Sequence, residues 1–190
     1  YILDLERKGF PFRNANRFNI VPVENANAFP RMLAQVLKED NCEIVVVESF
    51  TKYVEQVNTL ATNSFKGYDI WSFYNRTIRN MLDSIKNDKA TIIFTAVDDI
   101  VKIPQITGGE SSHRRVKVQG KVHEGAVEKE FLMVLFTEVR KNEKTEEMEY
   151  FFQTNTDGVT SAKTPMGMFD KQLIPNDIVE VLKKVEEYYA

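Results

Sequence analysis

The chain has 190 residues, of which 43% are hydrophobic and 28% are charged, so its composition is that of an ordinary folded protein of one compact domain. The net charge of −3 excludes a protein that is basic overall, and any contact with nucleic acid must come from a local basic patch. One cysteine excludes an intrachain disulfide, two histidines exclude the usual zinc clusters, and no apolar run approaches the roughly 20 residues of a membrane span. We therefore expect a cytoplasmic protein that does not contact membranes.

Residues 1–9, YILDLERKG, predict a strand with acidic residues at its end, followed by a glycine turn. On an extended strand Asp4 and Glu6 point to the same face, where two carboxylates can hold a metal ion or polarise a water molecule. A solvated strand end is the alternative. Because the chain opens with Tyr1, directly on a strand, we expect an N-terminal portion to precede it, unless cleavage has exposed a true terminus.

A short second strand and a helix follow in residues 18–37. Pro22 interrupts the strand and predicts a position at a sheet edge, because proline has no backbone N–H to donate. The helix has apolar residues at helical spacing on one face, namely Phe29, Met32, Leu33, Val36 and Leu37. A helix of this length before a buried strand is typical of a crossover between parallel strands.

The buried strand lies in residues 42–51, CEIVVVESFT. Four apolar residues without alternation, 44–47, predict a strand covered on both faces, as in a parallel sheet. Glu48 and Ser49 follow at its carboxyl end, where such sheets place their chemistry. A carboxylate followed by a hydroxyl there is the Walker B arrangement, which positions Mg²⁺ beside a nucleotide phosphate. The alternative is a buried strand that ends in a surface glutamate.

Two helices separated at Gly67 come next, and then a second apolar strand over residues 90–100. Its carboxyl end carries Thr95 and an acidic pair, Asp98 and Asp99. If the sheet is parallel, this polar end faces the same site as Glu48.

Residues 101–120 are rich in glycine and serine and form the most basic stretch, which predicts a mobile loop. The loop either contacts the phosphates of nucleic acid or nucleotide, or it is a solvated hairpin tip. Residues 130–140 and 148–155 then predict a hairpin that adds antiparallel strands to the parallel sheet. A loop over residues 156–170 contains Lys163, and a last helix begins near residue 177.

Four segments in chain order, ILDLE, VVVES, TIIFTA and QTNTDGVTSAKTPMG, resemble the phage ATPases with a RecA-like core that act in single-strand annealing recombination. The resemblance spans nearly the whole chain. It implies one α/β domain over residues 1–190, a RecA-like P-loop NTPase core with a mainly parallel sheet flanked by helices and an antiparallel C-terminal hairpin. It also implies ATP and Mg²⁺ as cofactors, single-stranded DNA as a partner, a ring or filament of identical subunits, and ATP hydrolysis that accompanies DNA binding and annealing.

The resemblance assigns roles to individual residues. Glu6 matches the glutamate that activates the attacking water. Glu48 and Ser49 match the Walker B pair, with Glu48 as the Mg²⁺ ligand in place of the usual aspartate. Thr95 matches a sensor of the γ-phosphate, and Lys163 matches a basic residue that reaches the nucleotide of the adjacent subunit.

The basic loop matches the DNA-facing loops of such proteins. Its predicted DNA contacts are Arg114, Arg115 and Lys117, so that replacing both arginines by alanine should weaken DNA binding and flatten its salt dependence.

One element of the family is absent from residues 1–190, because no GxxxxGK[ST] motif occurs in them. In the family the P-loop strand and helix precede the ILDLE strand, so we expect that segment upstream of Tyr1. The alternative is a non-catalytic interaction module that keeps a RecA-like shell and has lost ATP binding. Another P-loop motor, of the DNA-packaging or helicase type, is a third reading.

Overall fold

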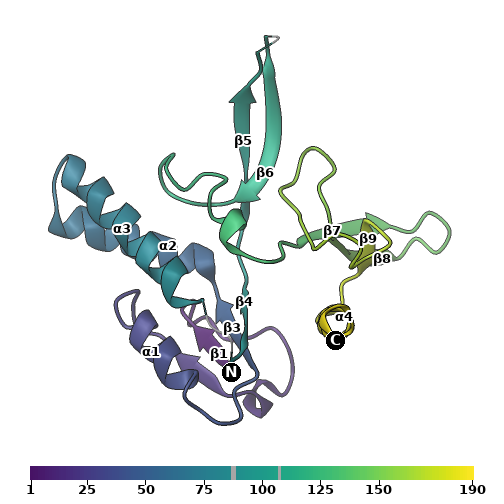
Figure 1. Ribbon diagram of the computed structural model, residues 1–190, viewed down its shortest axis with the longest axis horizontal. Coiled ribbons are helices and arrows are strands. Elements are labelled where there is room, and N and C mark those ends of the chain that lie inside the picture. The colour runs from purple at the N-terminus through teal and green to yellow at the C-terminus, as the bar shows by residue number, and fades with distance from the viewer. Residues whose placement is uncertain (87–88, 107) are drawn as a thin grey trace. The chain divides into compact units, whose positions relative to one another are not determined.

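The computed structural model describes residues 1–86, 89–106 and 108–190 (Figure 1). Contacts within the chain gather in two compact units, which we describe separately. The first unit contains Tyr1–Asp98 and Val116–Glu124, and the second contains Asp99–Arg115 and Gly125–Ala190. The α/β class is confirmed, whereas a single RecA-like domain over the whole chain stays a prediction.

The first unit contains a four-stranded sheet in the order β2-β1-β3-β4, with all neighbouring strands parallel. Its strands are β1 (Ile2–Asp4), β2 (Ile20–Pro22), β3 (Ile44–Glu48) and β4 (Thr91–Phe94). The parallel pairing confirms the prediction from the apolar run of β3. Strand β2 is an edge strand, as Pro22 predicted, because an edge leaves one side of the backbone without a partner. The second apolar strand is shorter than predicted and ends at Phe94.

The α-helices α1 (Phe29–Val36), α2 (Phe50–Ser64) and α3 (Tyr68–Ser84) belong to this unit. Helices α2 and α3 lie side by side (Figure 1). Gly67 separates them with a φ of 58°, a backbone conformation that residues with a side chain rarely adopt. The predicted break between the two helices is therefore confirmed and has a backbone cause.

Aromatic rings join the helices to the sheet in the core of the first unit. Phe29 of α1 is completely buried, and its ring centroid lies 5.2 Å from that of Tyr53 on α2 and 6.3 Å from that of Phe94 on β4. Phe50, at the start of α2, meets the same Phe94 ring edge-on at 6.1 Å. Because such rings bury large apolar areas, this cluster fixes α1 and α2 against the strands that carry the carboxyl edge.

Residues Val116–Glu124 return to the first unit and pack on α3. The Gln119 N–H donates a hydrogen bond of 3.1 Å to the Tyr74 hydroxyl, and the Tyr74 ring meets His123 edge-on at 6.0 Å. Trp71 packs edge-on against Tyr74 at 6.2 Å. As the one tryptophan of the chain, Trp71 reports on the folding of this unit alone.

The burial of His123 makes the stability of the first unit depend on pH. Burial lowers the pKa of the imidazole below its ordinary value of 6.5; a hydrogen bond with the Asn75 backbone opposes this shift, and the charge of Arg79 adds to it. In this range the unfolded chain binds the proton more readily, so the free energy of unfolding should fall as the pH drops below about 6.5. We expect His123→Phe to reduce this fall between about pH 7.5 and about pH 5.5 in urea titrations followed by Trp71 fluorescence. His113→Gln, which changes a histidine of the second unit, is the control, and equal pH dependence in the parent and His123→Phe would contradict the prediction.

The second unit contains two sheets and a terminal helix. A hairpin consists of β5 (Asp98–Pro104) and β6 (Glu110–Val116), and a three-stranded antiparallel sheet consists of β7 (Phe136–Lys141), β8 (Met148–Gln153) and β9 (Leu173–Pro175). Along the chain, the short 3₁₀ helix η2 (Glu128–Glu130) follows β6 and precedes β7. The last helix is α4 (Ile178–Tyr189), which is capped by Asp177.

Two sequence predictions for the second unit are wrong. The mobile loop predicted over residues 101–120 consists largely of β5 and β6, which pair in a two-stranded sheet, so of the two readings the hairpin is the one that the strands support. The hairpin of β7 and β8 does not add strands to the parallel sheet. It forms a separate sheet with β9, which pairs with β8 on the side away from β7. Among the described residues, no helix is both long and apolar enough to cross a membrane.

Candidate functional site

The carboxyl edge of the parallel sheet brings together three segments that are far apart in sequence. Asp4 pairs in register with Glu48 across β1 and β3, so the two strands end at the same level. Thr95 follows β4, and its N–H donates to the carbonyl of Val47 at 3.1 Å. This arrangement confirms for Thr95 the prediction that the end of the second apolar strand faces Glu48, whereas Asp98 and Asp99, predicted at the same end, belong to β5 in another sheet.

Backbone hydrogen bonds extend the sheet beyond the strand ends. The carbonyl of Glu48 accepts from the N–H groups of Leu5 at 2.8 Å and Glu6 at 3.2 Å. On the other side, the Phe50 N–H donates to the carbonyl of Thr95 at 2.8 Å. The loops that carry the polar side chains are thereby fixed to the sheet by their own backbones.

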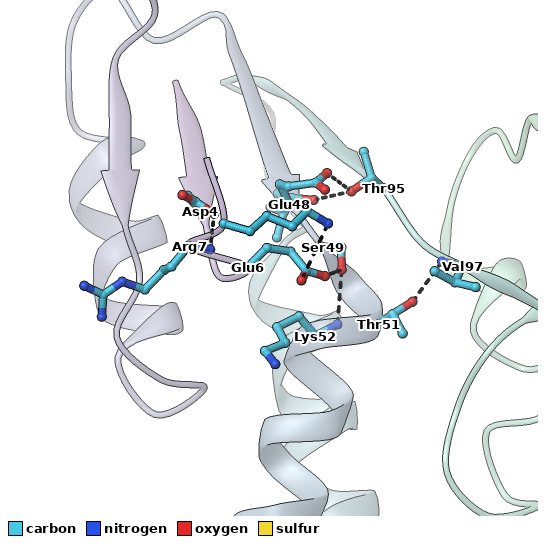
Figure 2. Close-up of polar contacts among 11 residues, drawn as sticks. Asp4, Glu6, Arg7, Glu48, Ser49, Thr51, Lys52, Thr95 and Val97 are labelled. Atoms are coloured by element: carbon cyan, nitrogen blue, oxygen red, sulfur yellow. Dashed lines mark hydrogen bonds and ion pairs between the residues drawn. The ribbon is translucent and has the colours of Figure 1, made fainter. Parts of the chain in front are cut away.

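Glu6 and Ser49 meet directly at this edge (Figure 2). The Ser49 hydroxyl donates to Glu6 Oε1 at 2.8 Å. Ser49 Oγ also accepts the Lys52 N–H at 3.1 Å, which makes Ser49 the N-cap of α2. The second Glu6 oxygen, Oε2, lies 3.7 Å from the ammonium of Lys8. Ser49 is buried and the Glu6 side chain is 24% exposed, so one carboxylate oxygen is held by the protein while the group remains reachable.

Because Ser49 both caps α2 and holds Glu6, we expect Ser49→Ala to destabilise the first unit by about 1–2 kcal/mol. The substitution leaves the Lys52 N–H without its side-chain acceptor and removes the donor to Glu6. Urea denaturation followed by Trp71 fluorescence measures the loss. Thr59→Ala is the matched control, since Thr59 is an exposed hydroxyl residue of the same helix and its loss should cost less than about 0.5 kcal/mol. An equal effect of both substitutions would refute the dual role of Ser49.

Glu48 is oriented by the neighbouring strand. The Thr95 hydroxyl donates to Glu48 Oε2 and also lies 3.3 Å from the carbonyl oxygen of Val47 (Figure 2). The peptide bond between Glu48 and Ser49 is cis. The predicted metal ligand and the predicted phosphate sensor are thus in contact through their side chains.

Asp4 does not act together with Glu6 as the strand pattern predicted. Strand β1 ends at Asp4, so the alternation of side chains does not continue to Glu6. The buried Asp4 carboxylate instead accepts the Arg7 N–H at 2.8 Å and closes a turn in which Arg7 has a φ of 52°. The prediction of a shared strand face is therefore wrong, and Asp4 shapes the loop that presents Glu6.

The donors at this edge fit Mg²⁺ in their chemistry. Across residues 1–86, 89–106 and 108–190, no three His, Cys, Asp or Glu side chains are grouped so that they could hold a metal ion. Mg²⁺ in nucleotide sites commonly takes only one or two carboxylates from the protein and completes its shell with phosphate oxygens and water. Glu48 and Ser49 offer a carboxylate and a hydroxyl oxygen, which is a donor set of this kind.

Lys163, the other predicted catalytic residue, belongs to the second unit. Its N–H and carbonyl each form a 2.9 Å hydrogen bond with Val134, in an isolated antiparallel bridge, and its side chain is half-buried. In the same segment the Asp157 carboxylate closes a turn by accepting hydrogen bonds from the backbone N–H groups of Thr160 and Val159. These hydrogen bonds hold the pKa of the Asp157 carboxyl far below its usual range. The role of Lys163 at a neighbouring subunit stays a prediction.

The three predicted DNA contacts are half-buried and lie on or next to a strand, not in a loop. Arg114 and Arg115 are adjacent on β6, so their side chains leave opposite faces of the hairpin. The Arg114 guanidinium lies 5.4 Å from the centre of the Phe136 ring. The Arg115 guanidinium lies against Gly125, and a Cβ atom added to Gly125 would lie 1.4 Å from Arg115 Nη1. Lys117, in the first unit, donates its N–H to Val97 O at 2.9 Å.

Two contacts at the carboxyl edge were missed from the sequence. Lys8 pairs with Glu6, and the Thr51 hydroxyl accepts the Val97 N–H at 2.9 Å, which ties the segment after β4 to α2 (Figure 2). A cation two residues after Glu6 and a hydroxyl two residues after Ser49 are visible in the sequence, yet neither spacing is specific for such a contact.

Comparisons with protein-family models, with curated proteins and with solved structures find no match to the chain.

Proposed function

We propose that the carboxyl edge of the parallel sheet binds ATP with Mg²⁺ and hydrolyses it, in a protein that binds single-stranded DNA and promotes its annealing. The observation that carries this proposal is the contact between Glu6 and Ser49 beside the contact between Glu48 and Thr95. Glu6 is a partly exposed carboxylate held by Ser49, and Ser49 directly follows Glu48, a carboxylate suited to a metal ion. Activation of water next to a metal-bound phosphate uses two such carboxylates, one for the water and one for the metal.

Each side chain has a task in this proposal. Glu48 and the Ser49 hydroxyl would hold Mg²⁺, which would neutralise charge on the phosphate oxygens. Glu6 would orient the attacking water and accept its proton, and the Lys8 ammonium pairs with the Glu6 carboxylate. The Thr95 hydroxyl, which donates to Glu48 Oε2, would donate to a phosphate oxygen instead when nucleotide is bound.

The remaining parts of the proposal concern an adjacent subunit and DNA. Lys163 would reach the nucleotide of an adjacent subunit in a ring or filament of identical chains. Arg114, Arg115 and Lys117 would contact DNA phosphates, although Arg114 and Arg115 leave opposite faces of β6 and so cannot line one flat surface. The local cluster of positive charge in a chain of net charge −3 is what supports this contact.

ATP turnover by the full-length protein tests the proposal. We expect phosphate release that requires Mg²⁺ and that increases when oligothymidylate is added. The absence of turnover with Mg²⁺ and oligothymidylate both present would contradict the proposal and support the alternative, a non-catalytic interaction module.

A further inference from the structure

The loop that connects β1 to β2 differs in charge from the rest of the chain. Residues 7–19, RKGFPFRNANRFN, here called the aromatic-basic loop, contain no acidic residue. They carry four cations in a chain of net charge −3: Arg7, Lys8, Arg13 and Arg17. All four side chains are exposed, so the loop is a local positive patch on the first unit.

Three phenylalanine rings of this loop form a connected cluster. The ring centroids of Phe10 and Phe12 are 5.3 Å apart, and those of Phe12 and Phe18 are 5.7 Å apart with the rings edge to face. The Arg17 guanidinium lies 4.8 Å from the centre of the Phe18 ring. Phe12 remains 43% exposed and Phe18 39% exposed, so much of their ring surface faces solvent instead of the core.

Backbone hydrogen bonds hold the loop in this shape. The Arg17 N–H donates to Asn14 O and the Phe18 N–H donates to Ala15 O, each at 3.1 Å, around the 3₁₀ turn η1 (Ala15–Arg17). The Ile2 N–H donates to Asn19 O at 2.9 Å and ties the end of the loop to β1. A surface that is already ordered loses little conformational entropy when a ligand binds to it.

Exposed aromatic rings among cations are what single-stranded nucleic acid requires, because its bases stack on ring faces and its phosphates contact cations. A duplex offers the phosphates but keeps its bases stacked inside. An anionic membrane also attracts cations, yet membrane-surface segments bury long apolar faces, and residues 7–19 contain no Leu, Ile, Val, Met or Trp. Three asparagines in the loop, Asn14, Asn16 and Asn19, add amide groups that can bond to base edges.

We propose that the aromatic-basic loop is a binding site for single-stranded DNA, in which bases stack on Phe12 and Phe18 and Arg13 contacts the phosphates. The inference takes its ligand from the proposed function and adds a contact surface separate from Arg114, Arg115 and Lys117. Lys8 belongs to this loop and lies 3.7 Å from Glu6 Oε2, so DNA on the loop lies next to the proposed catalytic base.

Fluorescence anisotropy of labelled oligothymidylate of about 20 nucleotides, with the full-length protein and without ATP, tests the site. We expect Phe12→Leu, which keeps an apolar side chain but removes the ring, to weaken binding by about fivefold or more, because one base–ring stack corresponds to a factor of about 5 to 150. Phe12→Tyr keeps the ring and should keep the affinity. Phe65→Leu is the matched control, since Phe65 is 37% exposed, belongs to the same unit and lies outside the loop.

Arg13→Gln provides a second variant that disturbs no packing, because Arg13 is exposed. It should make the negative slope of log affinity against log salt shallower by about 0.7, the value for one phosphate contact on a single strand. If the parent binds the oligonucleotide and both Phe12→Leu and Arg13→Gln leave binding unchanged, the loop site is refuted while the proposed function stands. If the parent does not bind it, the DNA part of both is refuted. If Phe12→Leu keeps its affinity for the oligonucleotide but loses binding to vesicles of phosphatidylcholine and phosphatidylserine, the site is overturned in favour of a membrane surface.

Discussion

Replacing Glu6 by glutamine is expected to lower ATP turnover by about 10²- to 10⁴-fold, the usual contribution of a positioned general base. A glutamine side chain has the same size and its Oε1 can still accept the Ser49 hydroxyl, so the structure around α2 should persist. The amide cannot take a proton from water, and it cannot pair with Lys8 as the carboxylate does. Steady-state phosphate release by the full-length protein, with Mg²⁺ and oligothymidylate present, measures the effect.

Two measurements make this result specific to the catalytic step. Nucleotide affinity should change little in Glu6→Gln, because the carboxylate is assigned to water and not to the nucleotide. Glu24→Gln is the matched control, since Glu24 is an exposed glutamate of the same unit and should leave turnover unchanged. Full turnover in Glu6→Gln would show that Glu6 is not the base.

The largest loss of stability is expected for Phe29→Ala, at about 3–5 kcal/mol. Phe29 is completely buried and contacts the rings of Tyr53 and Phe94, so the smaller side chain leaves a cavity between α1, α2 and β4. The neighbouring residues cannot collapse into it without moving elements that the sheet fixes. Urea denaturation followed by Trp71 fluorescence reports on the first unit and gives the change.

Gln35→Ala provides the control for Phe29→Ala, because Gln35 is an exposed residue of the same short helix. We expect it to change the free energy of unfolding by less than about 0.5 kcal/mol. If Phe29→Ala costs no more than Gln35→Ala, α1 is not packed on the sheet as described, and the position of the carboxyl edge loses its main support.

The parallel sheet and its polar edge could be predicted from the sequence because their signals are local. The unbroken apolar run of β3 predicts a parallel sheet, and the parallel order then places Glu48 beside the end of β4. The contact between Thr95 and Glu48 follows from these two facts alone. Only one face of β3 is fully buried, since Val45 and Val47 are buried whereas Ile44 and Val46 are half-buried.

Other features depend on contacts that no local pattern contains. The pairing of β9 with β8 joins strands separated by a long irregular segment, and only this pairing shows that β7 and β8 form a sheet of their own. The turn closed by Asp4 depends on where β1 stops, which the alternation in residues 1–9 does not reveal. The ring cluster of Phe10, Phe12 and Phe18 lies in a loop, where residues follow no period that would predict their contact.

The central claim is that Glu48 and Ser49 hold Mg²⁺ for a bound nucleotide. Calorimetric titration of the full-length protein with a non-hydrolysable ATP analogue, with and without Mg²⁺, tests it most directly. We predict that the analogue binds more tightly with Mg²⁺ in the parent and that Glu48→Ala removes this difference, while Glu24→Gln retains it. Equal affinities with and without Mg²⁺ in the parent, or an unchanged Mg²⁺ effect in Glu48→Ala, would contradict the claim.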